Sequence, residues 1–495
     1  MTAEPVLVCN PCVIPLADVP RGDYSWLRSL VLEKVAGGWQ LASLFVHPGK
    51  TGNHLVAVLA GQDGQGIAVA MAEVGDSFSS LTPECNQAHL FEREIFELHG
   101  ITPAGHPWLK PVRQTVADAK GEPVSVDYYR VAGAEVHEVA VGPVHAGVIE
   151  PGHFRFQCHG EKVFHLEISL GYQHRGVEGK LVGGPDARSR HLLETVAGDT
   201  TCGHANTYAM LVEALAGIEV AEEANRIRAI GLELERIANH TGDLGALAGD
   251  VGFLPTASYC GRLRGDILNL TALLCGNRFG RGLVVPGGVA YGLDGEQAGA
   301  MRTRLLAAMR DIRGAAKLLF TRPSVLSRFE GTGVVDRHSA DHLGLVGPAG
   351  RASGLEIDVR RDLPHGAYRD GTFPLRIGTH GDVMDRARQR EAEIDDSSAW
   401  LEQWLEQDCR ATPVPADAAA SLRGECLAVA FSEGWRGRIC HAALTDPAGR
   451  FASYKIVDPS FHNWSGLAMA LRGGQISDFP LCNKSFNLSY CGFDL

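Results

Sequence analysis

Residues 222–247 read EEANRIRAIGLELERIANHTGDLGAL, and this stretch decides which class of fold the chain adopts. Its apolar residues recur every three, four or seven positions, which places them on one stripe of an α-helix. Similar helical patterns follow in 295–320 and, after a glycine-rich turn, in 372–407. We therefore expect a helix bundle in the middle of the chain. The stripe in the first helix consists of Ile227, Ile230, Leu234, Ile237 and Leu244.

The N-terminal region predicts a small sheet followed by a helix. Three apolar runs within 23–75 alternate with glycine and proline turns, which is typical of short strands. The stretch CNQAHLFEREIFELHGI at 85–101 carries apolar residues near the helical spacing. Residues 110–132 are rich in proline and glycine and show no periodicity, so we place a domain boundary there.

Strands are also expected on both sides of the helix bundle. The stretch HFRFQCHGEKVFHLEISL at 153–170 alternates around Gly160 and Glu161, which predicts a hairpin. Residues 424–458 contain further apolar runs around the turn DPAGR. The predicted fold class is therefore α+β, with a small N-terminal α/β domain followed by a mainly helical domain that carries small β-sheets.

Composition and charge exclude several classes of function. The formal net charge is −12, so we expect no nucleic-acid partner, because phosphate binding needs a basic face. No run of about 18 apolar residues occurs, so the chain is not expected to span a membrane by itself. The N-terminus has no basic segment before a long apolar one, so no secretory signal is expected. Twelve scattered cysteines, including one incidental CxxC pair at Cys9 and Cys12, indicate a reducing cytoplasm.

Six motifs, spread over most of the chain, point to a family. In order they are GPVHAG (142–147), GYQHRGVEGKL (171–181), LELERIANH (232–240), VPGGV (285–289), HGDVMDRARQREAE (380–393) and DPSFHNWSGLAMALRGGQISD (458–478). Together they resemble the large subunit of membrane-bound, energy-converting nickel–iron hydrogenases of the formate-hydrogenlyase type. They also resemble its relative, the quinone-site subunit of respiratory complex I.

The resemblance extends to the N-terminal region and implies a division into domains. The stretch FEREIFELHGITPAGHPWLKPVR (91–113) resembles the end of the small complex I subunit that neighbours the quinone-site subunit. Formate-hydrogenlyase large subunits carry both parts fused. The implied parts are a small-subunit-like α/β domain at 1–112, a linker at 113–135, and a large-subunit-like domain at 136–495.

The metal ligands decide the activity in this family, and here they are missing. Hydrogenase large subunits hold their metals with four thiolates, arranged as two CxxC pairs. The matching positions are Ala197 and Thr200 in the first pair, and Ser489 and Gly492 in the second. The quinone-facing tyrosine of complex I also has no counterpart near Gly198. The resemblance therefore implies no cofactor in this chain, iron–sulfur clusters in partner subunits, and quinone as a candidate ligand.

Three candidate catalytic residues remain. Glu178 matches the glutamate that passes protons in the hydrogenases, and its structural alternative is an ion pair with Arg175 or Lys180. Arg436 matches a basic residue that lies over the metal pocket in the family. The alternative is that Arg436 is a solvent-exposed arginine in a turn. His145 matches a complex I histidine that would donate a hydrogen bond or a proton to a quinone headgroup. The alternative is that His145 caps a loop.

A metal site built from other ligands is a separate hypothesis. Cys202, His204, Cys482 and Cys491 lie close to the lost ligand positions, and the family fold would bring both segments to one pocket. Three thiols and an imidazole suit a tetrahedral metal site. The alternative is that these cysteines are small buried apolar side chains.

The resemblance implies three functions that stay open. The first is a subunit, without its own nickel–iron centre, of a membrane-associated oxidoreductase complex that couples electron transfer to ion translocation. The second is a non-catalytic structural or coupling subunit of such a complex, and the third is a hydrogenase with atypical metal ligands. Expected partners are a small iron–sulfur subunit and membrane subunits, on the cytoplasmic face of the inner membrane. NAD is not expected to bind, because no GxGxxG motif opens a βαβ unit.

Overall fold

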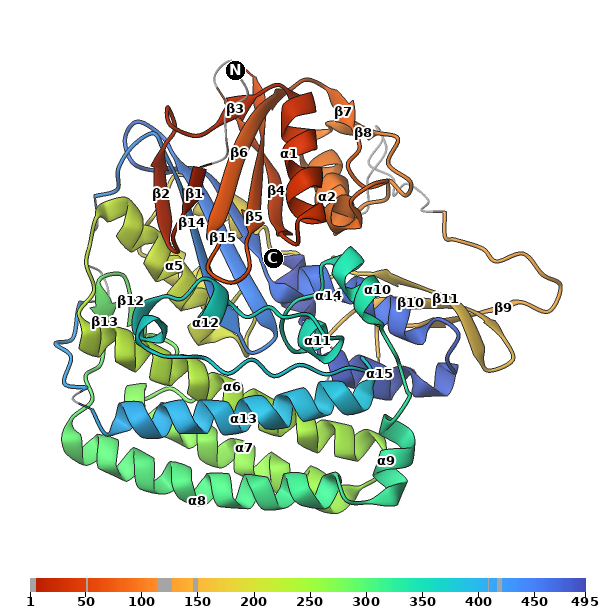
Figure 1. Cartoon of the computed structure of the whole chain (residues 1–495), viewed down its shortest axis with the longest axis vertical. Coiled ribbons are helices and arrows are strands. Elements are labelled where there is room, and N and C mark those ends of the chain that lie inside the picture. The colour runs from red at the N-terminus through yellow and green to blue at the C-terminus, as the bar shows by residue number, and fades with distance from the viewer. Residues whose placement is uncertain (1–5, 50–51, 114–126, 146–149, 408, 416–420) are drawn as a thin grey trace.

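The computed structural model describes residues 6–49, 52–113, 127–145, 150–407, 409–415 and 421–495. Helices hold 45% and strands 19% of the residues, and the strands form several small sheets, which confirms an α+β fold. Figure 1 shows the N-terminal segment, red to orange, at one end of the molecule and the long helices at the other.

A five-stranded sheet covered by one helix forms the core of the N-terminal part. The sheet has the order β1-β6-β5-β4, and β3 pairs with β6 in parallel. Its strands are β1 (Val6–Val8), β3 (Arg21–Gly22), β4 (Gln40–Pro48), β5 (Asn53–Ala60) and β6 (Ile67–Val74). The three apolar runs predicted as strands within 23–75 are β4, β5 and β6, so that prediction is confirmed; the same stretch also contains α1 (Tyr24–Ala36), for which no helix was predicted. Asp23 caps this helix by accepting a hydrogen bond from Trp26 N, and helical spacing buries one side of it: Leu27, Leu30 and Val31.

The helix expected at 85–101 is confirmed. It consists of α2 (His89–His99), preceded by a 3-10 turn η1 (Asn86–Ala88). The helix ends at Gly100, whose φ of 68° is the left-handed conformation that glycine adopts without strain. Next to it, β7 (Ser77–Ser79) and β8 (Thr102–Ala104) pair in parallel.

The predicted hairpin is confirmed as β10 (His153–His159) and β11 (Lys162–Ser169), and β9 (His137–Val141) pairs with the other edge of β10. A second sheet contains β16 (Phe451–Val457), β15 (Gly437–Thr445), β14 and β2, in that order. In it, β2 (Cys12–Pro15) pairs with β14 (Cys426–Gly434), so a segment near the N-terminus completes a sheet formed mainly by the C-terminal region. The domain boundaries stay a prediction, and residues 114–126 of the predicted linker lie outside the described residues.

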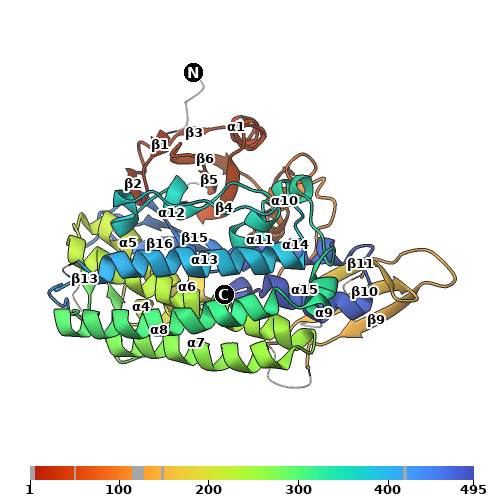
Figure 2. The same ribbon diagram turned by 60° about the horizontal axis from the view of Figure 1, so that its bottom comes forward.

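Four long helices pack side by side and form the predicted bundle (Figures 1 and 2). They are α6 (Glu222–Asp250), α7 (Leu254–Cys275), α8 (Gly295–Leu319) and α13 (Val383–Leu405). The apolar stripe of α6 is buried at all five of its predicted positions, because α7 and α13 pack against this helix. None of the described helices combines the length and the apolar composition that crossing a bilayer requires.

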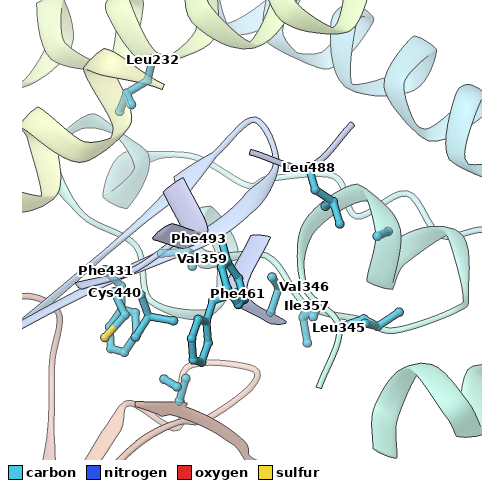
Figure 3. Packing of buried hydrophobic residues seen from close by; sticks show 14 of the residues in the cluster. Leu232, Leu345, Val346, Ile357, Val359, Phe431, Cys440, Phe461, Leu488 and Phe493 are labelled. Atoms are coloured by element: carbon cyan, nitrogen blue, oxygen red, sulfur yellow. The ribbon is translucent and has the colours of Figure 1, made fainter. Parts of the chain in front are cut away.

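The structure also contains the following elements: α3 (Val177–Leu181), α4 (Ser189–Leu193), α5 (Thr201–Ala216), α9 (Pro323–Phe329), α10 (Arg337–Leu343), α11 (Gly347–Ala352), α12 (Val359–Asp362), η2 (Gly366–Asp370), α14 (Pro459–Leu471), η3 (Ile476–Asp478), α15 (Phe479–Phe486), α16 (Tyr490–Asp494), β12 (Val284–Val285) and β13 (Gly288–Val289). The core joins distant segments, as Figure 3 shows: Phe431 pairs with Cys440 across β14 and β15, and the rings of Phe461 and Phe493 stack 5.3 Å apart.

Candidate functional site

The two segments that match the family's ligand loops meet at one place in the fold. The first precedes α5, and the second leads into α16 near the C-terminus. Arg175 bridges them, because its guanidinium donates to Thr195 O at 2.6 Å and to Cys491 O at 3.1 Å. The lost ligand positions of the two segments therefore lie around one buried region.

These ligand positions carry no side chain that suits nickel. Ala197 and Thr200 are almost completely buried. Ser489 caps α16 by accepting a hydrogen bond from Gly492 N at 2.9 Å. A β-carbon added to Gly492 would lie 2.7 Å from Asp458 Cγ, which is closer than real β-carbons come to other atoms. A nickel–iron centre held by four thiolates therefore does not fit the residues present.

An ion pair stands between the two former ligand segments. Arg436 bonds Asp199 in a bidentate manner, with Nη1–Oδ1 at 2.6 Å and Nη2–Oδ2 at 2.8 Å. Its Nε donates to Asn487 O at 2.5 Å, and its guanidinium lies 3.9 Å from the ring centre of Trp435. Partial burial acts to raise the pKa of the Asp199 carboxyl, but Arg436 outweighs it and lowers that pKa. Arg436 is 6% exposed, so it is a buried, paired cation and not a solvated turn residue.

Glu178 has partners that the sequence did not indicate. Its Oε1 accepts a hydrogen bond from Ile456 N at 2.8 Å and lies 3.0 Å from Lys455 Nζ. Among the described residues, the ion pair of this carboxylate is with Lys455 and not with Arg175 or Lys180, the partners expected from the sequence. Glu178 thus joins α3 to the end of β16.

Lys455 continues this charged cluster into the N-terminal part. Its Nζ lies 2.6 Å from Glu94 Oε2, and Glu94 also pairs with Arg113. All three side chains are less than 5% exposed. Burial acts to raise the pKa of Glu94, but Lys455 and Arg113 together outweigh it and hold that pKa at about 2. The ion pair between Glu94 of α2 and Lys455 of β16 therefore connects the N-terminal part to the large-subunit-like region.

His145 lies in the loop before β10, partly buried, with its ring 6.3 Å from that of Phe154. Its Nε2 is 3.1 Å from Gly152 O, and because a carbonyl only accepts, this nitrogen carries a proton. The other nitrogen, Nδ1, is therefore the one able to meet a ligand. On another side of Phe154 lies Tyr490, a buried tyrosine that the sequence analysis did not single out. The motif residues after His145, 146–147, lie outside the described residues.

A large cavity in the described part of the chain lies away from the three candidates. A cavity of about 590 Å³ lies between α2, β11 and α14, and none of Glu178, His145 and Arg436 lines it. Each of the three is instead bonded to groups of its own.

The four residues proposed as new metal ligands lie in different surroundings. Cys202 begins α5, His204 bonds two other side chains, and Cys482 lies close to Arg386. Across the described part of the chain, no three His, Cys, Asp or Glu side chains come together in a way that could hold a metal ion. Burial raises the pKa of Cys482 and of Cys491 to about 11, so both thiols are protonated at neutral pH. A metal site built from these four residues therefore stays a prediction.

The sequence predicted the candidate catalytic residues but not the residues with which they form ion pairs. Asp199, Lys455 and Glu94 decide how Arg436 and Glu178 are held. A signal was present, because Lys455 lies in the apolar stretch FASYKIV, and Glu94 lies next to Ile95 and Phe96 of the predicted helix. A charge inside a buried element needs a counter-charge, although the sequence does not say which residue supplies it.

The family model of the respiratory-chain NADH dehydrogenase 49 kDa subunit matches residues 250–423, and that of the 30 kDa subunit matches residues 45–132. The carbon monoxide-induced hydrogenase of Rhodospirillum rubrum is 32% identical, over 71% of this chain and 97% of its own length. Hydrogenase-4 component G of Escherichia coli is 30% identical, over 83% of this chain and 75% of its own.

This chain therefore belongs to the family that joins complex I 49 kDa-type subunits with the large subunits of energy-converting hydrogenases, and it carries the 30 kDa-type part fused in front. The expected family is confirmed. A solved structure of the membrane-bound sulfane sulfur reductase, an archaeal respiratory membrane complex, shares the fold, with a TM-score of 0.67 and 23% identity. It covers 73% of this chain and 99% of its own.

Proposed function

We propose that this chain is a subunit of a membrane-associated oxidoreductase complex, in which it forms a redox pocket without a nickel–iron centre. Relatives of the chain are parts of hydrogenase and complex I-like assemblies, which supports the kind of complex. Electrons would arrive from clusters in a small iron–sulfur subunit, and membrane subunits would couple their transfer to ion translocation. The complex would lie on the cytoplasmic face of the inner membrane.

The loss of all four thiolates carries this proposal. The family's ligand positions hold Ala197, Thr200, Ser489 and Gly492, and the last has no room for a side chain. Thiolates are the ligands that nickel needs in this family. Because the residues present supply no thiolate at these positions, we expect no nickel–iron centre. What remains near the two loops is a set of proton-binding and charged groups, which suits the reduction of an organic acceptor such as quinone.

In that reduction, which adds two electrons and two protons to the quinone, each candidate residue would have a role. His145 donates Nε2–H to Gly152 O, so a protonated ring would present Nδ1–H to a quinone oxygen. Glu178, held by Lys455, would pass protons toward the pocket. Arg436 would place positive charge where the reduced headgroup is negative.

The test is the metal content and the quinone reaction of the intact complex, purified from its native membrane. We expect iron at cluster stoichiometry and far less nickel than one atom per chain. Nickel equal in amount to the chain would overturn the proposal. We further expect His145→Phe to raise the KM for a soluble quinone by about tenfold, since one hydrogen bond to a charged group is lost. His159→Phe, at the exposed end of β10, is the matched control and should leave KM unchanged.

A second candidate function is a structural or coupling subunit whose old pocket is filled. The bidentate Arg436–Asp199 pair, which lies where the pocket would be, favours it. The same experiment distinguishes the two candidate functions. Full quinone turnover with every variant of His145 and Arg436 would support the structural subunit and exclude the redox pocket.

A further inference from the structure

The cavity of about 590 Å³ lies where the N-terminal part of the chain meets the large-subunit-like region. The N-terminal part supplies α2 and residues of the segment 106–113. The large-subunit-like region supplies β11, the residues directly after it, and α14. Small-molecule sites usually have volumes of about 300–1,000 Å³. The cavity is therefore large enough for an organic ligand, and both fused parts of the chain line it.

The charged side chains of this lining are mostly basic. They are Arg93, Lys110, Arg113 and Arg472, with Glu167 as the acidic one. Lys110 Nζ lies 2.7 Å from Glu167 Oε1, and Arg113 pairs with Glu94 of α2. Within the part of the chain that the structure describes, Arg93 and Arg472 form no ion pair. The lining therefore carries two cations that no carboxylate contacts directly.

Arg93 and Arg472 are held in different ways. Arg93 donates to Lys110 O and to Pro111 O, both at 2.7 Å, which fixes its guanidinium against the segment that carries Lys110. Burial lowers the pKa of Arg93 to about 10, although nearby carboxylates act to raise it, so this group is charged at neutral pH. Arg472 stands at the end of α14 and is exposed, so its side chain is free to turn toward a ligand.

The ring of His165 on β11 shows that Arg472 and Lys110 lie in the same region. Burial lowers the pKa of His165, and the charges of Arg472 and Lys110 lower it further, so both cations are close to this ring. The ring itself is then neutral at neutral pH. We call Arg93, Lys110 and Arg472 the basic wall of the cavity, because these three residues concentrate positive charge in one part of the lining.

Another part of the lining is apolar. Trp464 and Phe493 are at most 4% exposed. Ala468 and Met469 on α14 are partly buried. A hydrocarbon chain that covers this surface is removed from water together with it, which is favourable in proportion to the area buried. The cavity thus presents positive charge and apolar surface to the same ligand.

We propose that this cavity binds an amphiphilic organic anion, with its carboxylate or phosphate at the basic wall and its hydrocarbon chain along α14. An inorganic anion would leave the apolar surface uncovered, and a neutral hydrocarbon would leave the cations without a counter-charge. Acidic phospholipids and free fatty acids are the two sources of such an anion. Because both fused parts line the cavity, the ligand would also connect them. This inference is independent of the proposed function.

The test is equilibrium binding of dodecyl phosphate to the isolated full chain, purified without detergent and measured by calorimetry below the micelle concentration. We expect dodecyl phosphate to bind at least tenfold more tightly than hexyl phosphate, because the longer chain buries more apolar surface. Dodecyltrimethylammonium has the same hydrocarbon chain with the opposite charge, and it should bind at least tenfold more weakly than dodecyl phosphate. Equal binding of the two dodecyl compounds, or no binding of dodecyl phosphate, would overturn the proposal.

Two variants test whether the binding takes place in this cavity. Arg472→Gln should weaken dodecyl phosphate binding by about tenfold, since one hydrogen-bonded charge is lost. Arg310→Gln on α8 is the matched control, because its side chain is 80% exposed and lies outside the cavity, and it should leave the affinity unchanged. Ala468→Trp fills part of the cavity and should weaken binding by about tenfold or more, with thermal unfolding as the check that this variant folds. Unchanged affinity in Arg472→Gln, which needs no repacking, would overturn the site.

Competition against dodecyl phosphate distinguishes the two sources of the anion. The competitors are palmitate and dioctanoyl phosphatidylglycerol, with dioctanoyl phosphatidylcholine as the control that carries no net charge. Stronger competition by palmitate would assign the site to a fatty acid, and stronger competition by phosphatidylglycerol would assign it to an acidic phospholipid. Competition by neither anion, or equal competition by phosphatidylcholine, would contradict the proposed ligand chemistry.

Discussion

Glu94→Gln removes the central carboxylate of the cluster that fastens α2 to the rest of the chain. Glu94 Oε2 lies 2.6 Å from Lys455 Nζ, its other oxygen pairs with Arg113, and all three side chains are buried. Glutamine keeps the shape and loses the charge. Lys455 then keeps the carboxylate of Glu178 at 3.0 Å, whereas Arg113 loses its buried ion-pair partner Glu94. Breaking a buried pair on one side is strongly destabilising, because it leaves charge uncompensated.

The size of the effect follows from the pKa of Glu94, which falls from 4.5 to about 2 on folding. At about 1.4 kcal/mol for each tenfold change in equilibrium, this carboxylate contributes about 3 kcal/mol. The folded-state pKa is lower than the unfolded one, so the stabilisation is complete above about pH 4.5. It is lost as the pH falls through the folded value of about 2. The wild type and Glu94→Gln should therefore converge in stability on the acid side.

The assay is urea unfolding followed by tryptophan fluorescence, from pH 7 down to pH 3. We expect a deficit of about 3 kcal/mol for Glu94→Gln at pH 7, narrowing below about pH 4.5. Glu84→Gln is the matched control, because Glu84 pairs with Arg28 at the surface and its side chain is 56% exposed. This variant should cost less than about 1 kcal/mol. Equal losses in the two variants at pH 7, or a deficit independent of pH, would refute the reasoning.

Three further predictions concern the neighbourhood of the former metal site. Gly492→Cys restores a family ligand, but its β-carbon meets Asp458, so we expect a loss of about 1–3 kcal/mol in thermal or urea unfolding; a variant as stable as the wild type would mean that the turn has room. Asp382→Ala removes the N-cap that accepts from Asp385 N at 2.8 Å, and should cost about 1–2 kcal/mol in the same assay. Arg436→Met leaves Asp199 without its cation. The pKa of that carboxyl should rise, which ¹³C-NMR of labelled aspartate measures, and an unchanged pKa would contradict the ion pair.

Local patterns in the sequence predicted the helices of the bundle and the hairpin well, because the spacing of apolar residues in each segment has the period of the helix or strand that it forms. The stripe on α6 and the turn between β10 and β11 depend on neighbours along the chain. No helix was predicted at α1, whose segment YSWLRSLVLEKVA precedes the three apolar runs within 23–75 and also contains charged residues. The order of the six motifs likewise predicted the family, which the comparisons confirm.

By itself, the sequence determined the class of fold, the family and the loss of the four thiolates, since these follow from which residues stand at which positions. Only the tertiary structure decided which charges meet. Lys455 reaches Glu94 across 361 positions, and His204 reaches Asp458 across 254. Such pairs form because a buried charge or ring needs a partner within hydrogen-bond distance, and packing, not sequence spacing, determines which partner that is.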